Sequence, residues 1–182
     1  MLLTAPLCKF GWKAPDFILK DPDGISFQMS DHLGEKGLLI AFICNHCPHV
    51  QSIANSLVAD IQILSHLGIK ALAVMPNDYH TISEDSPFNM KNFATKYGFN
   101  FPYLIDETQE VARTYSAVCT PDFFGLNASG KLQYRGRLDN TVMNNRIEHR
   151  IPELVNAMRI VSATGCGPRD QIPSMGCSIK WR

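Results

Sequence analysis

The sequence lacks several features that would assign it to a class at once. Its 17 lysine and arginine residues equal its 17 aspartate and glutamate residues, so its charge does not suggest binding to nucleic acid or anionic lipid. No apolar run approaches the roughly 20 residues of a membrane-spanning helix. The N-terminus has neither the basic start nor the apolar core of a signal peptide. We therefore expect a cytoplasmic protein with no nucleic-acid partner and no membrane partner.

Internal repeats and long linkers are also missing, which favours a single domain. The 182 residues are 45% apolar and 19% charged, which suits one globular domain with a full hydrophobic core. We place this domain at residues 1–161. Residues 162–182 contain several glycines and prolines and predict an irregular C-terminal tail, which Trp181 is expected to dock onto the domain.

The hydrophobic pattern predicts alternating strands and helices. Continuously apolar segments at residues 38–43 and 69–75 fit strands that are buried on both faces. Between residues 50 and 67, apolar residues recur every three or four positions, which predicts an amphipathic helix. Ser86-Pro87 is typical of a helix start, and this second helix is expected to end near residue 97.

The remaining segments predict hairpins and shorter helices. A turn at 21–24 separates two short strands and indicates an N-terminal hairpin. Later segments predict, in order, a strand at 101–106, a helix at 107–115, a hairpin at 122–138 and a helix at 145–161 broken near Pro152. This order predicts one α/β domain with a central mixed sheet, in which parallel strands come early and an antiparallel pair closes the sheet.

Six cysteines are present, and two of them define the candidate site. Cys44 and Cys47 lie in the run ICNHCPH, between a predicted strand and a predicted helix. At a helix N-terminus, unpaired N–H groups and the helix dipole stabilise a thiolate, the species that attacks disulfides. We expect Cys44 to be the more exposed residue and the nucleophile. Cys47 would resolve the mixed disulfide.

The residues around the two cysteines offer further chemistry. A cationic His46 would stabilise the Cys44 thiolate and make the couple more oxidising; the alternative is a solvent-exposed loop histidine. Pro48 lacks an N–H and fits the first helical position, which would make Cys47 the N-cap. Cys44, Cys47 and His46 also form a soft ligand set suited to copper(I) or zinc, so metal binding stays open.

A later Thr120-Pro121, placed before a strand, completes a pattern that resembles the thioredoxin-like superfamily. The segment KAPDF at 13–17, the helix inserted after the second buried strand and the CNHCP run resemble its redoxin (AhpC/TSA-like) branch. The tail PSMGCSIKW at 173–181 is similar to that of redoxin-domain proteins carrying CNHCP. The resemblance implies a three-layer sandwich, in which helices flank a central mixed sheet, with an N-terminal hairpin and an inserted helix.

The same resemblance implies a thiol–disulfide oxidoreductase. Its partners would be disulfides or thiols of proteins or small molecules, with an unspecified upstream reductant, no cofactor, and a monomer or weak dimer as the assembly. Pro121 would have a cis peptide bond and lie against the dithiol. The backbone of Thr120 would then be free to pair with an extended substrate strand.

The chain departs from thioredoxins themselves at two positions. Ile43 stands where they carry tryptophan, and Leu38 stands where they bury an acid. Asp78, just after the second buried strand, is the nearest substitute and would accept the Cys47 proton. A turn-capping aspartate is the alternative for Asp78.

The chain also departs from the peroxiredoxin pattern. Peroxiredoxins need threonine three residues before the peroxidatic cysteine and proline four residues earlier still. Ala41 and Gly37 occupy these positions. Peroxide reduction by Cys44 is therefore the less favoured reaction.

Several other residues are candidates for auxiliary roles. Cys119 directly precedes Thr120-Pro121 and is either a third redox partner or a packed core thiol. Arg135 and Arg137 lie two apart on a predicted strand and would share one face, from which Arg137 could stabilise a thiolate; the simpler alternative is that both are solvated charges at the sheet edge. Cys166 and Cys177 could form a structural disulfide, form a second redox pair or reach the active site.

Overall fold

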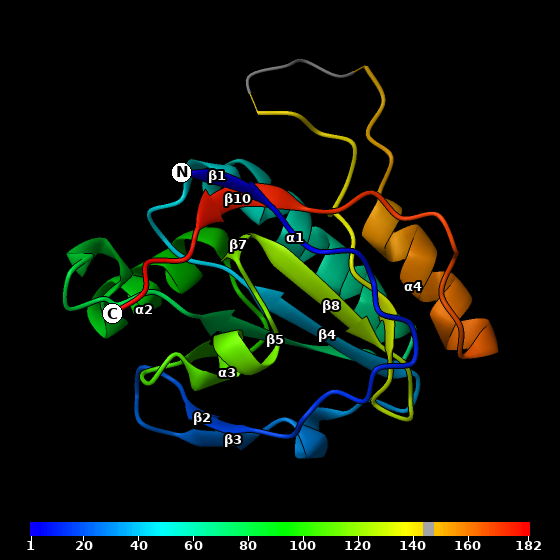
Figure 1. Cartoon of the computed structure of the whole chain (residues 1–182), viewed down its shortest axis with the longest axis horizontal. Helices are drawn as coiled ribbons and strands as arrows, with labels where there is room; N and C mark the ends of the chain where they lie inside the picture. Colours follow the sequence, from blue (N-terminus) through cyan, green and yellow to red (C-terminus); the bar gives the residue numbers. More distant parts are fainter. Residues whose placement is uncertain (144–147) are drawn as a thin grey trace.

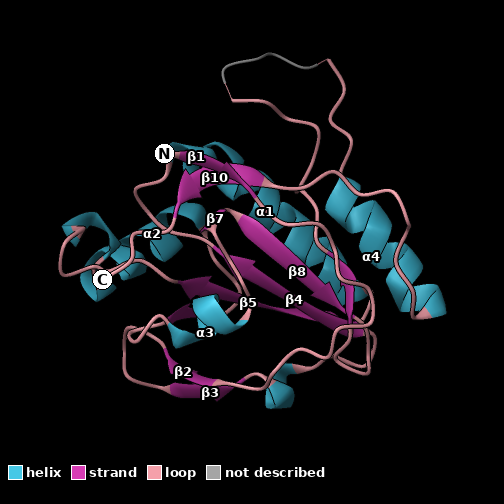
Figure 2. Ribbon diagram, in the orientation of Figure 1, coloured by secondary structure: helices cyan, strands magenta, loops and turns pink. Residues whose placement is uncertain are grey.

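A central seven-stranded sheet organises the chain (Figures 1 and 2). The computed structural model describes residues 1–143 and 148–182, where the strand order is β3-β2-β6-β5-β4-β8-β9. These strands are β2 (Ile18–Lys20), β3 (Ser26–Gln28), β4 (Gly37–Phe42), β5 (Ile69–Met75), β6 (Tyr103–Ile105), β8 (Asp122–Leu126) and β9 (Leu132–Tyr134). The helices are α1 (Pro48–His66), α2 (Pro87–Tyr97), α3 (Glu110–Thr114) and α4 (Glu153–Thr164), with single 3-10 turns at Ser30–His32 and Ser83–Asp85.

The two central strands, β4 and β5, are parallel and buried, as the sequence predicts. Their register runs from Gly37 opposite Ile69 to Phe42 opposite Val74. Every residue of β4 is buried, because α1, α2 and α4 pack on one face and α3 with the N-terminal segment packs on the other. β8 and β9 extend the sheet in antiparallel fashion. The expected mixed α/β architecture is confirmed.

Helix α1 follows the predicted apolar stripe. Its buried residues recur at helical spacing and face the core: Val50, Ala54, Leu57, Asp60, Ile61 and Leu64. The helix begins at Pro48, which has no N–H to leave unpaired. Gly68 follows the helix with φ +78°, a conformation that glycine adopts without steric cost. The Asp60 carboxylate on this buried face is paired with Arg150.

The predicted last helix begins later than expected. α4 starts at Glu153, with Pro152 as its N-cap, and ends at Thr164. Residues 148–151 are irregular because Arg150 pairs with Asp60 and Asp139, and the Ile151 N–H donates to the Asn140 side chain at 2.7 Å. The predicted segment 145–147 lies outside the described residues.

The tail that the sequence predicts to be irregular contains a strand. β10 (Met175–Ser178) lies between β1 (Leu2–Thr4) and β7 (Cys119–Thr120), and all three pair antiparallel in a second sheet. Figure 1 shows the red β10 beside the blue β1, so strands near the two ends of the chain lie side by side. Farther along, Trp181 stacks on the Arg113 guanidinium at 4.3 Å. Among the described residues, no helix combines the length and the apolar character needed to cross a membrane.

Candidate active site

The two cysteines lie where β4 gives way to α1. Cys47 is the N-cap of α1, with extended backbone at φ −73° and ψ 119°, and Pro48 occupies the first helical position. The Gln51 N–H donates to the Cys47 carbonyl at 3.0 Å, which closes the first turn. Both thiols therefore lie at the N-terminus of a 19-residue helix, where the helix dipole favours negative charge.

Cys44 and Cys47 are both fully buried, each with 0% of its surface exposed. The expectation that Cys44 is the more exposed residue is wrong. Its physical reason is that segments far away in the sequence cover the strand–helix junction. Thr120 contacts the sulfur of Cys44, and β10 contacts α1 beside Cys47.

Thr120 contacts both sulfurs. Its hydroxyl oxygen lies 3.2 Å from Cys44 Sγ, and its carbonyl oxygen lies 3.2 Å from Cys47 Sγ. The peptide bond from Thr120 to Pro121 is cis. A carbonyl oxygen can only accept a hydrogen bond, whereas a hydroxyl can donate one. Thr120 therefore favours a protonated sulfur at Cys47 and a negatively charged sulfur at Cys44.

The two thiols also act on each other. The hydrogen bond from Cys44 lowers the pKa of Cys47 to about 4, with a further contribution from Cys177. The same bond with Cys47, burial and the charge of Asp85 raise the pKa of Cys44 well above its usual range. The pair therefore gives up its first proton readily and holds the second tightly. These shifts by themselves place the first thiolate on Cys47, whereas the two contacts with Thr120 favour the charge on Cys44.

His46 is tied to a buried carboxylate. Its Nδ1 lies 2.6 Å from Asp85 Oδ2, and this bond raises the pKa of His46. Burial would raise the pKa of Asp85, but the hydrogen bonds from His46 and Asn77 outweigh burial and lower it. The backbone N–H groups of Asn45 and His46 donate to Asp85 Oδ1 at 2.8 and 3.1 Å. Asp85 thus fixes the loop that carries the dithiol.

Asp85 is the site residue that sequence reasoning missed. It lies in the turn before α2, and the only signal for it is that this turn follows a buried parallel strand. Asp78 precedes it on the same connection and has different contacts: its carboxylate accepts from the Thr81 hydroxyl at 2.7 Å and pairs with Arg182 at 3.3 Å. These contacts favour the turn-capping alternative for Asp78.

The two arginines turn away from the dithiol. β9 ends at Tyr134, so Arg135 and Arg137 lie beyond the observed strand, although the sequence predicts both to lie on it. Arg135 pairs with the buried Asp122 at 2.9 Å. Arg137 forms a two-pronged ion pair with Glu153 on α4, at 2.9 and 2.6 Å.

The remaining cysteines differ strongly in their surroundings. All six cysteines lie in the described part of the chain and are free thiols. Cys119 is buried and points to the Pro121 carbonyl at 3.7 Å, and burial raises its pKa to about 12. Cys166 is exposed, whereas Cys177 packs against the cluster that contains the dithiol. The structural disulfide considered for Cys166 and Cys177 is absent among these free thiols.

The backbone of Thr120 is not free, contrary to expectation. Cys177 of β10 lies opposite Thr120, and Ser178 lies opposite Cys119, in an antiparallel pair. The chain's own C-terminal strand therefore occupies the edge at which an extended substrate strand was expected. Ser174 and Gly176 fit closely against the Thr120-Pro121 turn, which explains why this strand lies there.

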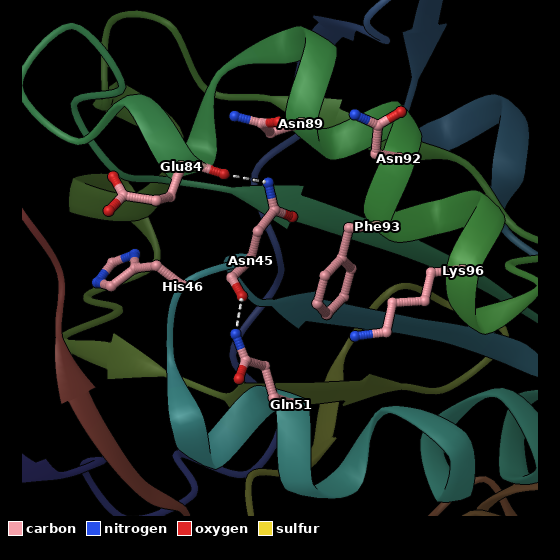
Figure 3. Close-up of a pocket in the computed structure, with 8 residues that line it drawn as sticks. All are labelled: Asn45, His46, Gln51, Glu84, Asn89, Asn92, Phe93 and Lys96. Atoms are coloured by element: carbon pink, nitrogen blue, oxygen red, sulfur yellow. Dashed lines mark hydrogen bonds between the residues drawn. The ribbon is translucent and has the colours of Figure 1, made fainter.

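A polar pocket lies beside the dithiol loop, on the α2 side (Figure 3). It has a volume of about 480 Å³ and is lined by His46, Phe93 and Lys96 among others. Figure 3 shows Asn45 between Glu84 and Gln51. The Asn45 side-chain amide donates to the backbone carbonyl of Glu84 at 3.0 Å, and the backbone carbonyl of Asn45 accepts from the Gln51 side chain at 2.7 Å. The pocket therefore borders the dithiol loop at Asn45 and His46.

The sequence from residue 10 to residue 135 matches one protein family, described as AhpC/TSA. This range includes both cysteines of the dithiol and the Thr120-Pro121 turn, and it covers more than half of the chain. The chain belongs to the AhpC/TSA family. The redoxin resemblance inferred from the sequence is thereby confirmed.

Curated proteins named as thiol-disulfide oxidoreductases are similar to part of this chain. Thiol-disulfide oxidoreductase ResA of Geobacillus thermodenitrificans (strain NG80-2) is 29% identical over 126 residues, which cover 68% of this chain and 66% of that protein. The matched region thus spans about two thirds of the length of that relative.

Two solved structures with a similar backbone identify the fold. A conserved protein from Geobacillus kaustophilus superimposes with a TM-score of 0.93 and 39% identity, over 100% of this chain and 97% of the other. The thioredoxin domain of a thiol-disulfide oxidoreductase from Bacteroides vulgatus superimposes with a TM-score of 0.63 and 18% identity, over 82% of this chain and 95% of the other. The thioredoxin-like fold is confirmed.

Proposed function

We propose that this AhpC/TSA protein is a thiol–disulfide oxidoreductase whose working groups are Cys44 and Cys47. The observation that carries the proposal is that both sulfurs lie at the N-terminus of α1 and contact Thr120 of β7. This arrangement supports a single shared thiolate, and a thiolate is the species that exchanges with disulfides. The name of the similar ResA protein supports the same class of reaction.

In the proposed reductive cycle, Cys44 attacks a substrate disulfide. One substrate sulfur leaves as a thiol, and a mixed disulfide joins Cys44 to the other. Cys47 then attacks Cys44 Sγ, the second substrate thiol leaves, and the Cys44–Cys47 disulfide remains. Two electrons pass from the dithiol to the substrate, and the oxidative direction is the reverse.

Thr120 supports the assignment of Cys44 as the attacking sulfur. When the shared proton lies on Cys47, that thiol can donate to the Thr120 carbonyl. The charge then lies on Cys44, where the Thr120 hydroxyl can donate to it. The substrates in this proposal are disulfides or thiols of proteins or small molecules.

His46 and Asp85 oppose each other at the dithiol. A cationic His46 favours a thiolate, whereas the negative charge of Asp85 raises the pKa of Cys44. We infer that the pair, rather than His46 alone, sets the redox potential of Cys44 and Cys47.

The test is a redox titration of the purified protein in glutathione buffers, with acid quenching, alkylation and mass spectrometry. We expect a reversible Cys44–Cys47 disulfide that is lost in Cys44→Ser and in Cys47→Ser. Cys166→Ser, which removes an exposed cysteine, is the matched control and should titrate as the wild type does. If no reversible disulfide links Cys44 to Cys47, the proposed function is wrong.

Metal binding is a second candidate, because ligand atoms of Cys44, His46 and Asp85 lie within 4.8 Å of one another. This set replaces the Cys47 of the sequence-based alternative with Asp85. A metal there would compete with the 2.6 Å bond between His46 and Asp85, so the redox proposal ranks first. Stoichiometric zinc or copper that is lost in Asp85→Asn would favour the metal site.

Peroxide reduction is the other alternative. Ala41 and Gly37 lack the side chains that the peroxiredoxin pattern needs, and both arginines near β9 pair with carboxylates. We expect consumption of hydrogen peroxide by the wild-type protein to be slow. A fast reaction that Cys44→Ser abolishes would reverse this ranking.

A further inference from the structure

The C-terminal strand places a third thiol beside the dithiol. In the pairing of β10 with β7, Cys177 lies opposite Thr120. Thr120 is also the residue that contacts the sulfurs of Cys44 and Cys47. Cys177 packs against the same buried cluster as these two cysteines. Cys177 of the C-terminal strand therefore gathers with Cys44 and Cys47 around one residue.

The fit of β10 at this edge is specific. A Cβ atom on Gly176 would lie 1.9 Å from the Thr120 carbonyl oxygen, a distance that no side chain could occupy. The Ser174 hydroxyl donates to the Pro121 carbonyl at 2.7 Å. Glycine at 176 thus lets the backbone of β10 approach the turn closely enough to bring Cys177 to the dithiol.

Within this cluster, both other thiols act on Cys47: hydrogen bonds with Cys44 and with Cys177 lower its pKa. Burial, and then the hydrogen bond with Cys47, raise the pKa of Cys177 to about 11. Cys177 is therefore a protonated thiol in the reduced protein.

The three residues also differ in their access to solvent. Cys44 and Cys47 are fully buried, whereas Cys177 is only partly buried. A disulfide between Cys44 and Cys47 would be shielded from an external thiol. A disulfide that includes Cys177 would present one sulfur at the edge of the site.

We propose that Cys177 is a third redox-active thiol, which exchanges with the Cys44–Cys47 disulfide and carries it towards the surface. The proposal rests on the proposed function. Cys177 loses its proton and attacks Cys47 Sγ; a Cys47–Cys177 bond forms, the Cys44–Cys47 bond breaks, and Cys44 leaves and takes up a proton. This exchange moves the disulfide without net oxidation or reduction.

The relay then delivers the disulfide to an external low-molecular-weight thiol. That thiol attacks Cys177 Sγ, Cys47 leaves as a thiol, and a mixed disulfide forms on Cys177. A second molecule of the thiol attacks the mixed disulfide, releases Cys177 as a thiol and leaves as the oxidised dimer. Two electrons pass from the two external thiols to the protein.

The first test traps the relay disulfide. The Cys44→Ser protein is oxidised with diamide, digested without reduction and mapped by mass spectrometry, with Cys44→Ala as a second variant if the first does not fold. We expect a Cys47–Cys177 disulfide in place of the Cys44–Cys47 disulfide. Cys166→Ser on the same background should leave this disulfide unchanged. If the folded variant shows no Cys47–Cys177 disulfide, the relay is overturned, whatever the reduction rates are.

The second test measures the use of the relay. The oxidised wild-type protein and oxidised Cys177→Ser are reduced with glutathione, and we expect the variant to react at least tenfold more slowly. Equal rates overturn the relay while leaving the proposed function intact, provided that both proteins form the Cys44–Cys47 disulfide. If the wild type forms no such disulfide, the proposed function itself fails, and the two failures are thereby distinguished.

Discussion

Nδ1 of His46 lies 2.6 Å from Oδ2 of Asp85, and this bond joins the dithiol loop to the turn before α2. Asp85 is fully buried, and all of its hydrogen bonds to this loop come from groups beside Cys44. A substitution at Asp85 should therefore change the environment of the two sulfurs, although Asp85 forms no hydrogen bond with either of them.

The charge of Asp85 should be visible in the thiol chemistry. In Asp85→Asn the side chain can still accept the loop N–H groups, but the negative charge that raises the pKa of Cys44 is gone. We expect a lower pKa for Cys44 and a more oxidising Cys44–Cys47 couple. Thiolate absorbance at 240 nm and a glutathione titration measure the two effects. Asp78→Asn is the matched comparison, and a larger effect there would show that Asp78, not Asp85, acts on the dithiol.

The ion pair of His46 and Asp85 should stabilise the protein in a defined pH window. The pKa of His46 is raised from 6.5, so its contribution is complete below about pH 6.5 and is lost as pH rises through the raised value. The pKa of Asp85 is lowered from 3.8, so its contribution is lost as pH falls below that value. Urea unfolding of reduced wild type and His46→Gln should differ by about 1.5–3 kcal/mol near pH 5.5. The difference should shrink at pH 9, and a constant difference would contradict this account.

The Thr120 hydroxyl should assist the attack by Cys44. In the wild type, the Thr120 hydroxyl lies 3.2 Å from Cys44 Sγ and acts to lower the pKa of that thiol. Thr120→Val removes this hydroxyl. We expect the variant to react with a small aromatic disulfide about twofold to tenfold more slowly, the rate loss of one hydrogen bond. Thr120→Ser keeps the hydroxyl and should restore most of the rate. Equal rates for the valine and serine variants would exclude this role.

The close approach of Gly176 to Thr120 should control access to the dithiol. Gly176→Ala places a methyl group where the Thr120 carbonyl lies, so β10 must move. We expect a bulky maleimide to label Cys44 and Cys47 at least tenfold faster in this variant than in the wild type, where both are buried. Ser178→Ala, on the same strand, should label as the wild type does. Unchanged labelling of Gly176→Ala would mean that β10 does not cover the site.

The buried carboxylate of Asp60 offers a test of stability away from the site. Arg150 binds both of its oxygens, at 3.0 and 2.5 Å, and also pairs with Asp139. Asp60→Asn should lower the free energy of unfolding by about 1–3 kcal/mol in urea titrations, because it leaves a partly buried guanidinium with one partner. Asp23→Asn breaks an exposed pair with Lys91 and should cost less than about 1 kcal/mol. Similar losses in the two variants would refute the difference in burial as the cause.

Local patterns predicted the parts of the fold that depend on local interactions. The apolar runs of β4 and β5 and the periodicity of α1 were sufficient, since burial on two faces and helical spacing leave direct traces in the sequence. Pro48 correctly marked the start of α1 and therefore the N-cap position of Cys47.

The parts that were missed depend on contacts between distant segments. β1 and β10 are short strands from opposite ends of the chain, and neither has the alternating pattern of a longer strand. The pairing of Thr120 comes from β10, and the position of Cys44 depends on Asp85, which binds the loop beside it. A sequence-based prediction that places Cys44 by its neighbours alone therefore makes it too exposed.

The order of the elements along the chain determines when the dithiol becomes covered during synthesis. The segments that bring Cys44 and Cys47 against Thr120 are complete at the end of β8, at Leu126, whereas β10 begins nearly fifty residues later, at Met175. A growing chain whose β4, α1 and β8 have already paired therefore carries an uncovered dithiol until β10 emerges from the ribosome. Newly made molecules are most open to exchange with other thiols in this interval.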